Sequence, residues 1–371
     1  MTERTEFSDS SQETPVPPTD FAALWGCPLQ AAHCPRCGVA HLIPAEMHTA
    51  LCPACFEARL EPQPTINRPE PPELLIDFSI TPAQVQAKFE TWLKGLWLRP
   101  KELQASVLAQ RLTRTFVPMW LVDGRVSGTW QAQMGYDYQV ASSQEVFRNG
   151  SWTTRKLTET RIRWEPRAGT VDRTYQNLST HALVEHPSLV KGLGKFRLEA
   201  ASNYSPAPLE RASVRVPSLL PEAAWPQAQA GLDRLAAQDC QAAADAQHVD
   251  EYGIQASYED LTWTQLLLPI YTTAYRDENG KVYSILVHGQ NGTIFGIKRA
   301  AQKLARNWSL GLAALALFCF VLGLLFAAGT ALLPALGVIS LLFFGSALLL
   351  GITAPLPAFW AWNINRQTEE D

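Results

Sequence analysis

The C-terminal part of this sequence contains a long stretch without a single charge. Residues 307–365 contain no Asp, Glu, Lys, Arg or His. Two apolar runs lie within it, at 308–328 and 331–354. Each is long enough to cross a hydrocarbon core of about 30 Å as a helix. A Gly-Thr pair and a proline interrupt the runs, so the sequence predicts a transmembrane helical hairpin at 307–356. Two buried helices of a soluble protein are the weaker alternative.

Basic residues flank the predicted hairpin on both sides. Lys298, Arg299, Lys303 and Arg306 precede the first run, and Arg366 follows the second. The connection between the runs carries no charge. The positive-inside rule places both flanks in the cytoplasm. We therefore expect the N-terminal body and the tail at 357–371 to lie on the cytoplasmic side of a bacterial inner membrane. Neither run offers an ionisable residue for an ion path, which favours an anchor over a channel.

Outside the hairpin, the composition is that of a soluble protein. The net charge of −4 and the isoelectric point near 6.0 argue against a strongly basic nucleic-acid binder. Residues 1–24 are acidic and rich in Ser, Thr and Pro, so we expect a disordered tail there. This segment lacks the basic start and apolar run of a secretory signal peptide.

Two C-x-x-C pairs predict a metal site. Cys34 and Cys37 form the first pair, and Cys52 and Cys55 form the second. Two such knuckles close a tetrahedron of thiolates around zinc, so we expect a zinc ribbon at 25–60 with one structural ion. Four cysteines leave no open coordination position for catalysis. The alternatives are disulfides, which need an oxidising compartment, or a redox pair, which needs a βαβ context.

Neighbouring residues offer further candidate ligands and a test of nucleic-acid binding. Cys27, His33, His41 and His48 lie close enough in sequence to join the site. Each is more simply a surface or packing residue. The arginines and glutamates of the ribbon cancel, so it lacks the basic patch that phosphate binding needs. A ribbon that braces the fold or docks a protein is the favoured interpretation.

The middle of the chain predicts an α+β body. A proline-rich linker at 61–76 is followed by a first module at 77–220 and a second at 221–300. Each combines a helix with an antiparallel meander, and the similar motifs at 117–120 and 268–271 indicate a duplication. Turns are expected at Asp123-Gly124, Asn149-Gly150, 277–280 and 290–292. The fold class is thus α+β, with an N-terminal zinc ribbon, a duplicated helix-plus-sheet body and a C-terminal transmembrane hairpin.

Six aromatic residues of the first meander raise the question of a binding platform. They are Trp120, Trp130, Tyr136, Tyr138, Trp152 and Trp164. Aromatic residues in alternating strands are more often core residues or cross-strand pairs than stacking platforms. We therefore predict a packing role.

Signatures of known catalysis are missing from the sequence. It contains no phosphate-binding loop, no G-x-S-x-G and no H-E-x-x-H. The histidines at 181, 186, 248 and 288 are scattered. We assign no catalytic residue and no small-molecule ligand.

The order of motifs resembles a family of bacterial zinc-ribbon membrane proteins of unknown function. The resemblance spans about residues 33–300 and rests on the double C-x-x-C, on W-L-K-G-L-W-L-R-P at 92–100 and on the segments at 117–121, 268–275 and 281–296. Some members are labelled as relatives of the primosomal replication helicase, which does not fit a chain without an ATP-binding loop. Many relatives have Asn-Gly-Gln-Thr-Gly where this chain has His-Gly-Gln-Asn-Gly at 288–292. The family implies no known activity.

Together these features predict a non-enzymatic function. We expect a membrane-anchored adaptor or scaffold that presents its cytoplasmic body to a protein partner. A membrane-attached nucleic-acid-binding protein is one alternative. An enzyme of unrecognised class is another, and it requires a deep pocket lined by clustered titratable groups.

Overall fold

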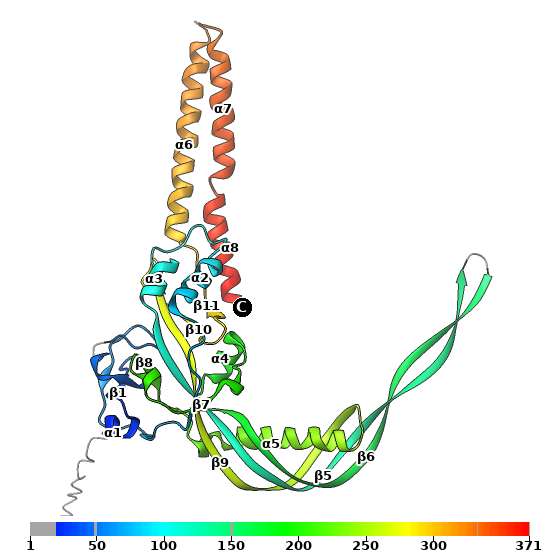
Figure 1. The fold of residues 1–371 in the computed structure, drawn as a ribbon. Helices are drawn as coiled ribbons and strands as arrows, with labels where there is room; N and C mark the ends of the chain where they lie inside the picture. Colours follow the sequence, from blue (N-terminus) through cyan, green and yellow to red (C-terminus); the bar gives the residue numbers. More distant parts are fainter. Residues whose placement is uncertain (1–19, 48–49, 149–150, 332, 371) are drawn as a thin grey trace, which may run out of the picture.

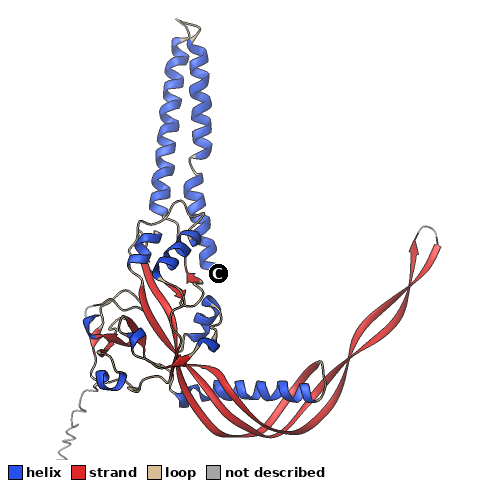
Figure 2. Ribbon diagram, viewed as in Figure 1, coloured by secondary structure: helices blue, strands red, loops and turns tan. Residues whose placement is uncertain are grey.

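The protein consists of a body built around one large sheet, a helical hairpin and a long curved β-ribbon (Figures 1 and 2). The computed structural model describes residues 20–47, 50–148, 151–331 and 333–370. Most of the expected disordered tail and the expected turn at Asn149-Gly150 therefore lie outside the described residues. The mixed α+β class, with a large sheet and two apolar C-terminal helices, is confirmed.

In the described residues, eleven strands form a single sheet, and eight of them follow the order β11-β10-β9-β5-β8-β2-β1-β3. β6 pairs with β5, and β4 pairs with β7 and β9. The long strands are β5 (Thr113–Arg148), β6 (Ser151–His181) and β9 (His248–Arg276). The short strands are β1 (Leu29–His33), β2 (Ala40–Pro44), β3 (Glu61–Pro62), β4 (Leu74–Leu75), β7 (Ser202–Asn203), β8 (Ala212–Arg215), β10 (Val282–His288) and β11 (Ile294–Gly296).

Both expected modules contribute strands to this one sheet. The two similar motifs face each other, because Val117 of β5 pairs with Leu268 of β9 in antiparallel register. Side chains from both strands are buried together, including Met119, Leu121 and Leu266. The core is therefore shared across the middle of the chain.

The turn expected at Asp123-Gly124 is wrong. β5 runs straight through these residues, and the pairing register shifts there as a β-bulge. The Asp123 carboxylate accepts a hydrogen bond from the Asn177 backbone N–H at 2.7 Å, across the strand pair. A Cβ on Gly124 would lie 2.8 Å from the Leu261 side chain. This Asp-Gly pair bends a strand, and its glycine admits a neighbouring side chain.

Helices cover parts of the sheet. α2 (Pro82–Trp92) begins with a capping box, in which the side chains of Thr81 and Gln84 each accept a bond from the other's backbone N–H. The remaining helices of the body are α1 (Phe21–Trp25), α3 (Ala105–Gln110), α4 (His186–Leu193) and α5 (Pro221–Ala243), with short 3-10 turns at Ala45–Met47, Leu198–Ala200 and Ala207–Leu209. α5 lies along the curved part of the sheet (Figure 1) and buries Leu232 and Ala236 in a cluster with Val126 and Met134.

Two long apolar helices leave the body as a hairpin. α6 (Gln302–Gly329) and the helical segment Leu336–Gln367, which begins with α7 (Leu336–Thr353), are both long and apolar enough to cross a membrane, as predicted. Only 11% of each apolar window is buried inside the protein, so these are not core helices of the body. The tail continues as α8 (Leu356–Glu370).

The base of the hairpin is tied to the body by specific bonds. The Asn365 side chain accepts from Ala300 N–H at 2.8 Å and donates to the Ala300 carbonyl at 3.0 Å. The Glu278 carboxylate caps α6 by accepting bonds from the backbone N–H groups of Lys303 and Leu304. These contacts fix α6 and α8 to the sheet.

The outer part of the β5–β6 ribbon extends beyond the rest of the sheet. β9 stops pairing with β5 at His248, opposite Gly135. We call residues 136–148 and 151–163 the arm, and in the described structure no third strand pairs with it. In Figure 1 the arm bends toward the side of the body from which α6 and α7 project.

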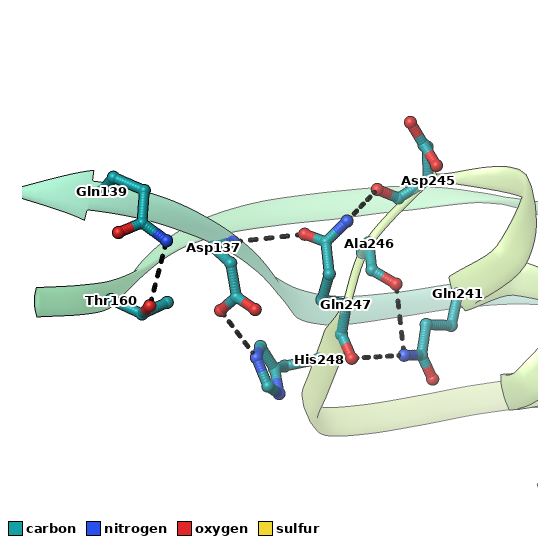
Figure 3. A network of polar contacts seen from close by, with 8 residues as sticks. All are labelled: Asp137, Gln139, Thr160, Gln241, Asp245, Ala246, Gln247 and His248. Carbon is teal, nitrogen blue, oxygen red and sulfur yellow. Dashed lines mark hydrogen bonds and ion pairs between the residues drawn. The ribbon is translucent and has the colours of Figure 1, made fainter.

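A polar network locks the root of the arm (Figure 3). The Gln247 side chain accepts from the Asp137 N–H at 3.1 Å, and His248 Nε2 lies 2.9 Å from Asp137 Oδ1. The Gln241 side chain donates to the carbonyls of Ala246 and Gln247 at 3.2 and 3.0 Å. The end of α5 and the start of β9 are therefore joined to the strand at the point where the arm begins.

Candidate metal centre

The four predicted cysteines come together at the edge of the sheet formed by β1, β2 and β3. The Sγ atoms of Cys34, Cys37, Cys52 and Cys55 all lie within 4.8 Å of one another. Cys34 and Cys55 are 3.6 Å apart, and Cys37 and Cys52 are 3.7 Å apart. A tetrahedron with metal–sulfur bonds of about 2.3 Å has edges of about 3.8 Å. The cluster therefore has the geometry of a metal-binding site, and all four thiols are free.

Each C-x-x-C pair sits in the same kind of tight turn. Gly38 N–H donates to the Cys34 carbonyl at 2.8 Å, and Phe56 N–H donates to the Cys52 carbonyl at 2.9 Å. Both residues that close the turns have positive φ, 71° for Gly38 and 57° for Phe56. Glycine adopts this conformation freely, whereas Phe56 adopts it at a cost. The two knuckles are thus structurally equivalent although only one carries the expected glycine.

Burial and backbone amides act on the thiols in opposite directions. Burial raises the pKa of Cys52 well above its ordinary value, against backbone hydrogen bonds from Cys55 and Ala54. Burial also raises the pKa of Cys37. At Cys34, burial is outweighed by hydrogen bonds from the backbone of Cys37 and Arg36, and the pKa is lowered. Four thiolates at these distances repel one another unless a cation lies between them. The cluster is therefore suited to a bound metal ion.

His41 is the nearest of the further candidate ligands. Its Nε2 lies 3.7 Å from Cys52 Sγ, and its side chain is fully buried. Burial, with Arg215 nearby, lowers the His41 pKa to about 3. A neutral imidazole at this distance suits an N–H donor to the Cys52 sulfur, outside the four-sulfur cluster.

Cys27, His33 and His48 do not join the cysteine cluster in the described structure. Cys27 is buried in a separate apolar cluster with Trp25. His33 Nε2 is 3.8 Å from the Glu61 carboxylate at the surface. His48 lies outside the described residues. Within the described part of the chain, the metal-ligating group consists of the four cysteines.

The ribbon that carries the cysteines is part of the main sheet. β2 pairs antiparallel with β8, where His41 faces Arg215 and Leu42 faces Val214. β8 in turn runs parallel to β5, where Phe116 faces Val214. The Thr115 hydroxyl is hydrogen-bonded to that of Ser213 at 3.0 Å in the interior. The cysteine cluster is therefore joined to the centre of the body by a continuous ladder.

A cleft of about 420 Å³ lies between the cysteine-bearing ribbon and the turn that joins β9 to β10. Its ribbon wall is apolar and includes Met47, Leu51 and Phe56. The opposite wall includes Glu102 and Arg111. These two form an ion pair at 2.7 Å, which lowers the Glu102 pKa. Glu102 and Arg111 are thus engaged with each other.

The six aromatic residues divide into two groups. Trp120 is fully buried and donates to the Leu219 carbonyl at 2.8 Å, and Trp130 stacks on Tyr252. The Tyr136 hydroxyl donates to the Ala244 carbonyl at 3.0 Å. Tyr138 and Trp152 are exposed along the arm, and Trp164 is exposed beside its root. The packing prediction holds for the first three residues, whereas these three side chains are exposed.

The scattered histidines do not form one site. His181 stacks on His186 at a ring distance of 5.0 Å, and His288 stacks on Phe196 at 3.9 Å. His248 belongs to the network at the arm root.

Comparisons with known proteins add no relative. No family model, curated protein or solved structure matches this chain.

Proposed function

We propose that this protein is a membrane-anchored zinc-ribbon scaffold that presents its α+β body to a protein partner. The observation that carries the proposal is the junction between the cysteine cluster and the sheet. The ribbon closes four sulfurs around one point and is continuous with β5 through β2 and β8. A closed four-sulfur centre braces a fold and leaves no position for a substrate.

Zinc is the metal that this donor set favours. Four sulfurs in a near-tetrahedral arrangement suit zinc or iron and disfavour magnesium and calcium. A reducing cytoplasm keeps the thiols available for metal. We assign one structural zinc ion to Cys34, Cys37, Cys52 and Cys55, with His41 as a hydrogen-bond donor behind Cys52.

The bacterial inner membrane is the proposed location, with the body and tail in the cytoplasm. Lys303 and Arg306 are exposed at the base of α6, where the body begins. Trp308, Phe359 and Trp362 are also exposed near this base, as expected for residues at a membrane–water interface. The membership in the bacterial zinc-ribbon membrane family belongs to the same proposal and rests on the double C-x-x-C and the segments that follow it.

The apolar cleft supports docking of a protein over enzymatic chemistry. An enzyme needs titratable groups that face a substrate. Here Glu102 accepts bonds from the Arg111 side chain and from the Arg276 backbone N–H, so its carboxylate is occupied. Apolar walls such as those of Leu51 and Phe56 fit a hydrophobic segment of a partner.

Nucleic-acid binding receives less support. Arg36 beside the cysteine cluster is paired with Glu57 at 3.0 Å. Along β6, Arg161 pairs with Glu159, and both Arg163 and Arg167 pair with Glu165. These paired arginines are not available for the phosphate contacts that nucleic-acid binding requires.

The test is affinity purification of the full chain from native membranes, followed by mass spectrometry and metal analysis. We expect one zinc per chain and a stoichiometric protein partner. Leu51→Asp should abolish capture of the partner and leave the zinc content unchanged. Leu24→Asp is the matched control, because Leu24 on α1 is 47% exposed and Leu51 is 49% exposed. Recovery of zinc without any partner would overturn the scaffold assignment.

A further inference from the structure

The end of the arm carries a pair of exposed aromatic side chains. Phe147 of β5 pairs with Trp152 of β6, and their ring centroids are 5.3 Å apart. Phe147 is 56% exposed and Trp152 is 68% exposed. Large aromatic side chains at the end of a two-stranded ribbon contribute nothing to a core. They indicate a surface that is covered in the working protein.

The charges near the aromatic pair have one predominant sign. Between residues 141 and 156 the sequence has Arg148, Arg155 and Lys156 against a single acidic residue, Glu145. Arg155 and Lys156 are exposed in the structure. The inner half of the arm differs, since its arginines are paired with glutamates. Positive charge is therefore concentrated around the aromatic end, where it complements an anionic surface.

The course of the arm brings this end to the level of the hairpin base. In Figure 1 the arm bends toward the hairpin side, and the outer ends of its coloured strands lie at the level of α8 along the hairpin axis. α8 carries the exposed Phe359 and Trp362, and α6 carries the exposed Trp308. These are the aromatic residues expected at the interface of a spanning hairpin. The arm end therefore lies at the height where the bilayer surface is expected.

We propose that the arm is a second membrane contact, with Phe147 and Trp152 inserted in the headgroup region of an anionic bilayer. The aromatic rings enter the interface, and Arg155 and Lys156 face the lipid phosphates. The network of Asp137, Gln247 and His248 holds the root of the arm at its angle. The proposal rests on the anchoring part of the proposed function, because α6 and α7 place the bilayer.

A photocrosslinker at the arm end tests this contact directly. The full chain, with p-benzoylphenylalanine in place of Trp152, is reconstituted in vesicles of phosphatidylethanolamine and phosphatidylglycerol and irradiated. We expect adducts with the mass of one lipid. The matched control carries the same crosslinker at Thr160, an exposed β6 position about 26 Å further from the tip. Lipid adducts at position 152 should exceed those at position 160 by at least about tenfold.

Each outcome decides a separate point. Alkaline extraction first shows whether the chain is integral to the vesicles, and release by alkali would refute the anchor itself. An integral chain that gives no lipid adduct at position 152 would refute only the arm contact. Adducts to a second copy or to another protein would assign the arm end to a protein interface and overturn the lipid assignment. Hydrogen exchange gives a second readout. We expect vesicles to slow exchange at the arm end of the wild-type chain. The double variant Phe147→Ser, Trp152→Ser should keep a folded body and show no such slowing.

Discussion

Cys52 is fully buried in the cysteine cluster, and its sulfur faces both Cys37 and His41. Cys52→Ser removes a sulfur donor that oxygen does not replace for zinc. We expect bound zinc to fall from about one ion per chain to near zero, with loss of ribbon stability. Mass spectrometry of purified protein for metal measures this. Cys240→Ser is the control, because Cys240 lies in the cluster under α5 and should leave the zinc content intact. Full zinc in the Cys52 variant would refute the assignment.

His186 gives the stability of the body a dependence on pH. Burial, followed by the nearby His181, lowers its pKa to about 4. Between that value and the unfolded pKa near 6.5, the unfolded chain binds a proton that the folded chain excludes. Stability is therefore full above about pH 6.5 and falls as the pH drops, by about 1.4 kcal/mol per unit for this group.

Thermal unfolding in detergent at several pH values checks the slope. His186→Gln should reduce the slope of unfolding free energy against pH by about 1.4 kcal/mol per pH unit, the contribution of one proton. Equal slopes in the wild-type protein and this variant would contradict the role of His186.

Single residues also explain which parts of the metal site were predictable. The C-x-x-C pairs are local in sequence, and so their geometry followed from spacing. Phe56 was not predictable, because the sequence gives no sign that a phenylalanine closes the second knuckle at φ 57°. The proximity of His41 to Cys52 depends on the β1–β2 hairpin, and spacing alone did not separate it from His33.

Among the elements, β5 and β9 leave no room between them for a side chain at Gly128. A Cβ at this position would lie 2.2 Å from the Gln255 carbonyl oxygen. Gly128→Ala must push the two strands apart, and we expect a loss of about 1–3 kcal/mol in unfolding free energy. Gly253→Ala is the matched control on β9, because its nearest neighbour is 4.0 Å away. Denaturant unfolding compares the two variants, and similar stabilities would show that the strands are not this close.

Asn365 is the element-scale link between α8 and the segment that precedes α6. Asn365→Leu leaves the buried N–H and carbonyl of Ala300 without their side-chain partner, at about 1–3 kcal/mol per group. We expect faster hydrogen exchange at residues 298–304 and release of α8. Asn363→Leu on the same helix should retain the slow exchange. Unchanged exchange in the Asn365 variant would argue against the link.

Elements that depend on local signals were predicted well, and elements that depend on distant partners were not. The capping box of α2 and the apolar runs of α6 and α7 each depend only on residues that are close in sequence. The strands that flank the expected turn at Asn149-Gly150 form the arm, but the continuation of β6 through residues 166–181 was not expected, because it depends on pairing with β5. The bulge at Asp123 was mistaken for a turn because Asp-Gly signals both.

At the scale of the whole molecule, the topology of the anchor can be measured. We predict that a reporter active only in the cytoplasm functions when fused after residue 371, whereas one inserted between α6 and α7 does not. The proposed orientation follows from the basic residues at the base of the hairpin and the positive-inside rule. A variant with Lys298, Arg299, Lys303 and Arg306 changed to Gln should lose the preference. A reporter that is active at both positions would refute the hairpin orientation.

The integration of the ribbon into the sheet could not be read from the sequence. β2 and β8 are separated by most of the first module, and their contact covers only two residue pairs. Such short, distant pairing leaves no periodic signal. The sequence therefore predicted a separate ribbon and linker, whereas the structure shows a shared ladder.

The bond between Asn365 and Ala300 has a mechanical consequence. It joins the chain just before α6 to α8, the helix that follows α7, and so restrains rotation of the hairpin relative to the body. A spanning helix pair adjusts its tilt to the thickness of the surrounding lipid. In such a bilayer the body must rotate with the pair. The arm then acts as a lever, and its outer end moves through a larger distance than the helices whose tilt has changed.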